Sequence, residues 1–122
     1  MAALTLLYDV NLLTVSAEHL FGCWNIRCGR PAPAPERLWS EGTRVQLGAG
    51  VLLLYTPSGV HQGTWQVERH RRQGQPFLVL HLPTGKVQVV VTRLRCSLDE
   101  RLRQLSLYFP SGLELELELT PF

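Results

Sequence analysis

Three Pro-x-Gly tripeptides divide the second half of the chain into short segments that have the pattern of β-strands. They are Pro57-Ser58-Gly59, Pro83-Thr84-Gly85 and Pro110-Ser111-Gly112. Proline fixes φ for the second position of a tight turn, and glycine supplies the positive φ that closes it. Because apolar, β-branched or alternating residues flank each tripeptide, each one predicts a β-hairpin. The chain is therefore expected to run as an antiparallel meander.

Period-two alternation is clearest in the last segment, where leucines occupy every second position from Leu113 to Leu119 and Glu114, Glu116 and Glu118 stand between them. A helix would scatter these leucines around its circumference, so the pattern predicts a half-buried strand. Similar alternating or continuously apolar runs predict seven more strands, at residues 22–28, 44–47, 51–55, 64–68, 77–82, 86–92 and 105–109. Residues 4–12 also alternate and predict a ninth.

Helix is scarce in this pattern. Ser16 is placed to cap a short helical turn through Phe21. Ser97 begins a second candidate helix over residues 97–103, with Glu100 at the position of a capping box. Residues 29–42 contain three alternate prolines and predict an irregular, Pro-rich loop.

The fold class that follows is all-β, with residues 1–122 as a single barrel domain. We expect an antiparallel up-and-down meander of eight to nine strands, closed or nearly closed into a barrel, with one or two short helical turns. Residues 1–15 would form an N-terminal strand extension. A sandwich of two sheets is the alternative.

Composition restricts the class of protein. A chain of 122 residues fits one domain, and with 45% hydrophobic and 18% charged residues it can bury a core and is not disordered. The net charge of +2 gives no strong attraction to nucleic acid or anionic membrane. The three cysteines are an odd number, which favours a reducing compartment. No Lys or Arg precedes Arg27, and the first apolar run is broken early, so we expect a cytoplasmic protein without a membrane span.

The segment after the predicted turn at Ser16 contains Gly22-Cys23-Trp24. This Gly-x-Trp resembles the start of lipocalin-like (calycin) domains, where a short helical turn leads into the first barrel strand. The resemblance implies a meander barrel around a cavity for small apolar ligands, with the tryptophan closing one end. Two features differ from that pattern. The last strand carries no arginine to cross the tryptophan, and residues 4–12 have no counterpart.

The first functional expectation is non-catalytic binding of a small apolar or amphiphilic ligand in the barrel, by Trp24, Tyr55, Trp65, Arg69 and Arg93. Arg69 shares a predicted face with Trp65, and Arg93 follows a row of alternating valines. An inward arginine without a carboxylate would imply a bound anion. In the alternative interpretation both strands reach the rim or bulge there, which leaves each guanidinium in water.

Two other functions are expected as alternatives. One is a protein-interaction module with a solidly packed barrel, forming a homodimer through the N-terminal strand at residues 4–12; that strand could instead pair with its own barrel. The other is nucleic-acid binding through the Arg69–Arg72 loop beside Trp65 and Phe77, which the balanced charge disfavours.

The sequence predicts no catalytic residues, no metal ligands and no cofactor. It has no Cys-x-x-Cys or His-x-His spacing, and no Gly-x-Ser-x-Gly elbow. Cys23 and Cys28 are five residues apart, so on one strand they would point to opposite faces. His61, His70 and His81 could converge from neighbouring strands, although no motif supports a site there.

Overall fold

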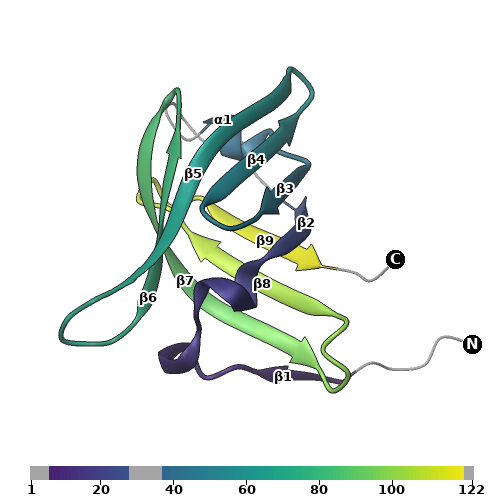
Figure 1. The fold of residues 1–122 in the computed structure, drawn as a ribbon, viewed down its shortest axis with the longest axis vertical. Helices are drawn as coiled ribbons and strands as arrows, with labels where there is room; N and C mark the ends of the chain where they lie inside the picture. The colour runs from purple at the N-terminus through teal and green to yellow at the C-terminus, as the bar shows by residue number, and fades with distance from the viewer. Residues whose placement is uncertain (1–5, 28–36, 120–122) are drawn as a thin grey trace, which may run out of the picture.

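In the computed structural model, eight antiparallel strands close into a barrel and a ninth lies beside one of them (Figure 1). The structure describes residues 6–27 and 37–119. Expectations for residues 1–5, 28–36 and 120–122 therefore lie outside the described residues. In chain order the elements are β1 (Leu7–Asp9), η1 (Leu12–Thr14), η2 (Ala17–Leu20), β2 (Gly22–Arg27), α1 (Arg37–Ser40), β3 (Arg44–Leu47), β4 (Val51–Thr56), β5 (Gly59–Arg69), β6 (Pro76–Leu82), β7 (Gly85–Ser97), β8 (Arg103–Tyr108) and β9 (Glu114–Leu119).

The barrel closes because each strand from β2 to β9 pairs with the next and β9 then pairs with β2. Strand β7 is thirteen residues long and has three neighbours: β6 along its first half, β8 along its second half, and β1 at its end. All the pairings are antiparallel. The predicted meander is therefore confirmed, and the sheet closes as a barrel.

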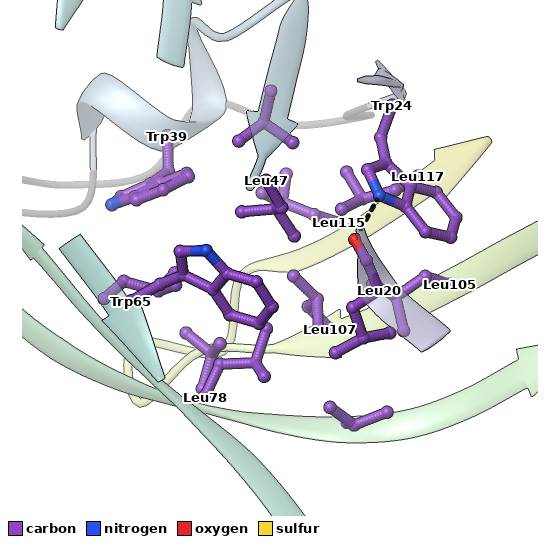
Figure 2. Close-up of a cluster of buried hydrophobic side chains, with 14 of the residues drawn as sticks. Leu20, Trp24, Trp39, Leu47, Trp65, Leu78, Leu105, Leu107, Leu115 and Leu117 are labelled. Atoms are coloured by element: carbon purple, nitrogen blue, oxygen red, sulfur yellow. Dashed lines mark hydrogen bonds between the residues drawn. The ribbon is translucent and has the colours of Figure 1, made fainter. Parts of the chain in front are cut away.

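Alternating side chains fill the inside of the barrel, as the sequence pattern predicts. In β9, Leu115 and Leu117 are buried while Glu114 and Glu116 are exposed. Figure 2 shows these leucines packed against side chains of the other elements, including the tryptophans. The buried interior consists of Leu and Val residues with three tryptophans and a phenylalanine. Burial of this much apolar surface is the main stabilising term of the fold.

Both ends of the barrel are covered by the chain itself. At one end η1 and η2 cross the opening, and the indole Nε1 of Trp24 donates to the carbonyl oxygen of Leu20 at 2.9 Å. At the other end α1 brings Trp39 against Phe109, with the ring centroids 5.9 Å apart. Trp39 is buried. The helical turn that carries it lies where the sequence predicted only an irregular loop.

The predicted ninth strand is confirmed as β1, but it is shorter than residues 4–12. It is limited to Leu7–Asp9 within the described residues, because the side chain of Asn11 accepts from the amide of Leu13 and starts η1. A second prediction of local structure is wrong. The helix expected after Ser97 is a turn. Glu100 adopts a φ of 61°, and the Ser97 hydroxyl accepts from the amide of Leu102. The short turn capped by Ser16 is confirmed as η2.

Gly63 in β5 provides a test of the barrel packing. A Cβ at this position would lie 2.0 Å from the carbonyl oxygen of His81, which belongs to the backbone of β6. Gly63→Ala is expected to lower the free energy of unfolding by about 1–3 kcal/mol, because the two strands must separate. Gly48→Ala is the control, since its nearest neighbour atom is 3.9 Å away. Equal urea midpoints for the two variants would contradict the close approach of β5 to β6.

Candidate functional site

The barrel interior is closely packed. An apolar space inside it, between Trp39 and inward side chains such as Leu47 and Leu78, measures about 10 Å³, roughly the room that one water molecule needs. Trp24 is 0% exposed and Trp65 is 4% exposed, so both expected ligand-binding tryptophans are core residues. The Trp65 Nε1 donates to the carbonyl oxygen of Gly48 at 2.9 Å, which fixes the indole across the strands. The structure thus places both tryptophans in contact with other side chains.

Tyr55 lies on the outer face of the barrel, whereas the sequence analysis placed it in the wall of a cavity. The guanidinium of Arg44 lies 4.5 Å from the centre of its ring, and its hydroxyl donates to Gln46 at 3.5 Å. Leu52 and Leu54, which alternate with it in β4, are the inward residues. Residues 51–55 are apolar on both faces, so their sequence contained no signal of which face points inward.

Arg69 holds the N-terminal segment against the β5–β6 hairpin. Its guanidinium donates to the carbonyl oxygens of Leu12 at 3.0 Å, of Gly74 at 2.9 Å, and of Val15. Arg69 is the last residue of β5, at the rim of the barrel. The backbone carbonyls around η1 therefore occupy the position that a bound anion was expected to take.

Arg103, at the start of β8, makes a similar contact that the sequence did not predict. Its Nη1 donates to the carbonyl oxygen of His19 at 2.9 Å, one residue before the carbonyl that accepts from Trp24. Arginine and tryptophan thus bind consecutive carbonyls of η2. The sequence predicts a helix over residues 97–103, and in a helix Arg103 would not be expected to reach the barrel opening.

Arg93 points away from the interior because of a β-bulge. The register between β7 and β8 shifts between Val91 and Arg93, which moves Arg93 off the inward face of the valines. Its Nε lies 3.6 Å from the carboxylate of Asp9, and the Nε of Arg95 lies 3.4 Å from the same oxygen. One carboxylate of β1 is thus shared by two arginines of β7.

A shallow polar groove of about 70 Å³ crosses the outer face of β7, β8, β9 and β2. Its charges pair within the protein: Arg27 lies 3.3 Å from Glu118, in addition to the contacts of Asp9. Ion pairs this exposed contribute little to stability. This surface is a solvated charged face rather than a patch of one sign.

Exposed apolar side chains gather at the protruding end of the sheet, where β1 lies against the end of β7 (Figure 1). Leu6 is 68% exposed, Tyr8 is 49% exposed, and Leu98 in the turn after β7 is 79% exposed. Tyr8 lies across from Cys96, and Leu6 and Leu98 each lie two residues from that pair, just beyond the last paired residues Leu7 and Ser97. We call Leu6, Tyr8 and Leu98 the apolar patch.

The backbone of β1 has one unused edge among the described strands. Strand β1 pairs only with β7, and the amide of Val10 donates to the carbonyl oxygen of Leu94 at 2.8 Å. The N–H and C=O groups of successive residues in an antiparallel strand point to opposite sides. Those of Tyr8 therefore point to β7, as the amide of Val10 does, and those of Leu7 and Asp9 point away from β7. We call this the free edge of β1. Such an edge is a template for pairing with another strand.

The Arg69–Arg72 loop forms the turn between β5 and β6. Arg71 and Arg72 are exposed there, and the ring of His70 lies 4.9 Å from that of Phe77. Trp65, which was expected to stack with bases beside this loop, is inside the barrel. The structure therefore brings no exposed tryptophan to these arginines.

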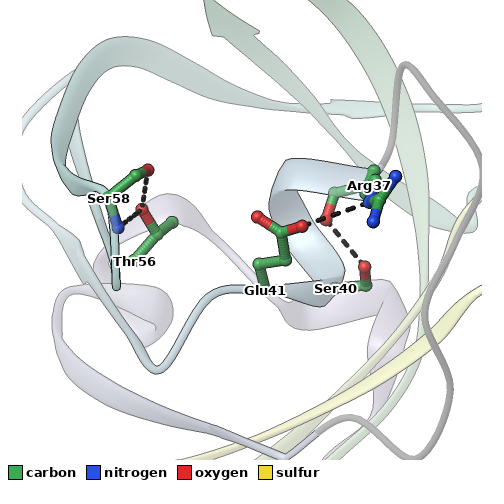
Figure 3. Close-up of polar contacts among 5 residues, drawn as sticks. All are labelled: Arg37, Ser40, Glu41, Thr56 and Ser58. Carbon is green, nitrogen blue, oxygen red and sulfur yellow. Dashed lines mark hydrogen bonds and ion pairs between the residues drawn. The ribbon is translucent and has the colours of Figure 1, made fainter.

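His61 belongs to a hydroxyl cluster at the β4–β5 hairpin. The hydroxyls of Thr56 and Ser58 lie 2.8 Å apart (Figure 3), and the His61 Nε2 lies 3.2 Å and 3.4 Å from them. The contacts close a turn at the tip of the hairpin. In the same view Arg37, the first residue of α1, forms an ion pair with Glu41, which follows the helix. Within the described residues, no three His, Cys, Asp or Glu side chains are grouped as metal ligands would be.

Cys96 is half-buried beside Tyr8, and burial raises the pKa of its thiol, against the opposing effect of Arg103. The thiol therefore stays protonated at neutral pH and reacts slowly with oxidants.

Comparison of the chain with protein-family models, with curated proteins and with solved structures gave no match. In the part of the chain that the structure describes, no helix has the length and apolar character needed to cross a bilayer.

Replacement of Trp65 tests the packed interior. Trp65→Ala is expected to cost about 3–5 kcal/mol of unfolding free energy, because loss of the buried indole would leave a cavity among the core side chains. Tyr55→Ala, on the outer face, is the control and should cost clearly less. Urea denaturation followed by circular dichroism measures both. A loss below about 1 kcal/mol for Trp65→Ala would place the indole outside the core.

Replacement of Arg69 tests its contact with the N-terminal segment. Arg69→Gln is expected to lower stability by about 1–3 kcal/mol, because three backbone carbonyls lose a charged donor. Hydrogen exchange at Val15 and His19 should accelerate in the same variant. Arg71→Gln, in the adjacent exposed turn, serves as the control. Unchanged exchange in Arg69→Gln would show that Arg69 does not hold η1.

Proposed function

We propose that this chain is a protein-interaction module that binds an extended segment of another polypeptide along the free edge of β1. The carrying observation is the coincidence of that edge with the apolar patch. Main-chain hydrogen bonds to Leu7 and Asp9 would supply affinity, and alternate side chains of the added strand would contact the patch. The expected partner segment is an antiparallel strand with apolar residues at every second position.

The edge carries little of the protection that exposed strands usually have. Lysine, proline or an inward charge commonly blocks pairing at such an edge. The charge that β1 does carry, on Asp9, contacts Arg93 and Arg95 on the side of β7. The shortness of β1 is its remaining protection, and it limits the partner to a few residues.

The barrel acts in this proposal as a rigid scaffold. Its closed sheet, its filled interior and the turns that cover both ends fix the position of β7, and β7 fixes β1. Binding sites held by rigid elements lose less conformational entropy when a partner binds.

Binding of a small apolar ligand inside the barrel is less well supported. The closed barrel agrees in architecture with the resemblance to calycins. However, a ligand of even a few atoms would need far more room than about 10 Å³, so core side chains would have to move. Native mass spectrometry separates the two proposals, since a bound ligand would add mass that disappears on denaturation.

The proposal is tested by selecting strand peptides from a displayed library of random heptapeptides. Peptides bound by the wild-type chain should lose at least about tenfold in affinity for Leu7→Pro, because proline removes the Leu7 N–H from the free edge while the bonds to β7 remain. Slower hydrogen exchange at Leu7 and Asp9 in the complex is the expected signature.

Two control variants separate edge binding from general adhesion. Leu6→Asp should weaken the selected peptides, whereas Val60→Asp, at an exposed apolar residue on the β4–β5 hairpin, should not. Failure to select any peptide, or equal binding to wild type and Leu7→Pro, would reject the edge as the binding site.

A further inference from the structure

We propose that the strand added to β1 is the β1 strand of a second copy of this chain, in a dimer with its two-fold axis at Tyr8. This inference rests on the proposed function, because it uses the same free edge, and it names the partner. The reason is that β1 is complementary to itself in one antiparallel register.

The backbone hydrogen bonds define that register. With Tyr8 across from the partner's Tyr8, Leu7 lies across from the partner's Asp9, and Asp9 across from the partner's Leu7. Leu7 and Asp9 are the residues whose N–H and C=O groups form the free edge. Both pairs would therefore be hydrogen-bonded, and Tyr8 would stand at a pair without hydrogen bonds, where the side chains are closest.

The side chains on one face match in the same register. On this face, side chains would lie side by side across the strands in rows. One row would contain Leu98, Leu6 and the partner's Val10, and the two-fold axis would generate a second, equivalent row. The middle row would place the two tyrosines between the two half-buried Cys96 residues. Aromatic and apolar pairs directly across strands are mutually stabilising. The apolar patch would become continuous with that of the second copy.

Charge selects this register over the one with its axis at Asp9. An axis at Asp9 would set two carboxylates directly across from each other, and like charges in such a position destabilise a sheet. An axis at Tyr8 places each carboxylate across from a leucine instead. It also leaves Asp9 on the face where Arg93 and Arg95 contact it. The dimer would thus need no broken ion pair.

A cysteine cross-link tests the register. The variant carries Tyr8→Cys with Cys23, Cys28 and Cys96 replaced by serine, so that the introduced thiol meets only its own copy in the partner. Residues at a pair without hydrogen bonds have Cα atoms about 4.5 Å apart, within the range of a disulfide. With oxidised glutathione as the oxidant, we expect a covalent dimer on a non-reducing gel.

Leu7→Cys in the same serine background is the matched control. Its cysteines would be two residues out of register and more than about 7 Å apart between Cα atoms, so its cross-linking should be at least about tenfold lower. Equal cross-linking of the two variants would overturn the register.

The oligomeric state of the full chain tests the dimer itself. Sedimentation equilibrium should give a dimer whose dissociation constant rises at least about tenfold in Leu7→Pro. Tyr8→Asp, which would place two charges at the axis, should have the same effect, and Val60→Asp should have none. A wild-type chain that stays monomeric up to about 1 mM would overturn the inference. If such a monomer still bound selected peptides in a manner lost in Leu7→Pro, the proposed function would stand without it.

Strand exchange is a distinct outcome. In Tyr8→Cys with Cys96 retained and the other two cysteines replaced, the thiol faces Cys96 of the strand to which β1 is bound. A disulfide within one chain is expected. A disulfide between position 8 of one chain and Cys96 of the other, located by peptide mapping, would mean that β1 pairs with the partner's β7, and it would overturn edge-to-edge pairing.

Discussion

Strand β7 has two pairing edges along its thirteen residues, and it uses them for three neighbours. One edge pairs with β6 over the first half and with β1 at the end, while the other edge pairs with β8 and so allows the barrel to close. The bulge between Val91 and Arg93 lies after the part of β7 that pairs with β6 and before the part that pairs with β1. It turns Arg93 outward, to Asp9. The barrel, the position of β1 and the charge next to it thus all depend on the length of this strand and on its one irregularity.

The N-terminal segment covers one end of the barrel and also fixes the position of β1. After β1, η1 and η2 run across the opening and bury Val15 and Leu20. Three side chains from three strands bind their carbonyls: Arg69 from β5, Trp24 from β2 and Arg103 from β8. Charged donors to backbone carbonyls are effective anchors. They fix β1 at its C-terminal end, so that the strand is presented in one position.

The alternation of apolar residues was enough to predict the meander, its hairpins and most of the core, since a one-residue slip would expose the leucines of β9. The alternation predicted the wrong face for a side chain where a bulge shifts the pattern or where both faces of a strand are apolar. The bulge reversed Arg93, and residues 51–55 are apolar on both faces, which hid the outward position of Tyr55. Of the surface now proposed, the sequence indicated the N-terminal strand. It could not show that Leu98 lies beside that strand, because the contact depends on pairing between residues far apart in the chain.

A filled interior and a strand with one unpaired edge have complementary roles in this fold. Since the core side chains leave almost no empty space, the barrel is stable without any contribution from β1's outer edge, and that edge is available for association. An unprotected edge is normally a hazard, because each added strand exposes another edge and growth continues. Pairing about a two-fold axis avoids this: each copy contributes its free edge of β1, both edges are used in the dimer, and the contact closes on itself. The three-residue length of β1 adds a second limit, because it provides too few backbone groups to hold a strand that lacks the matching apolar side chains.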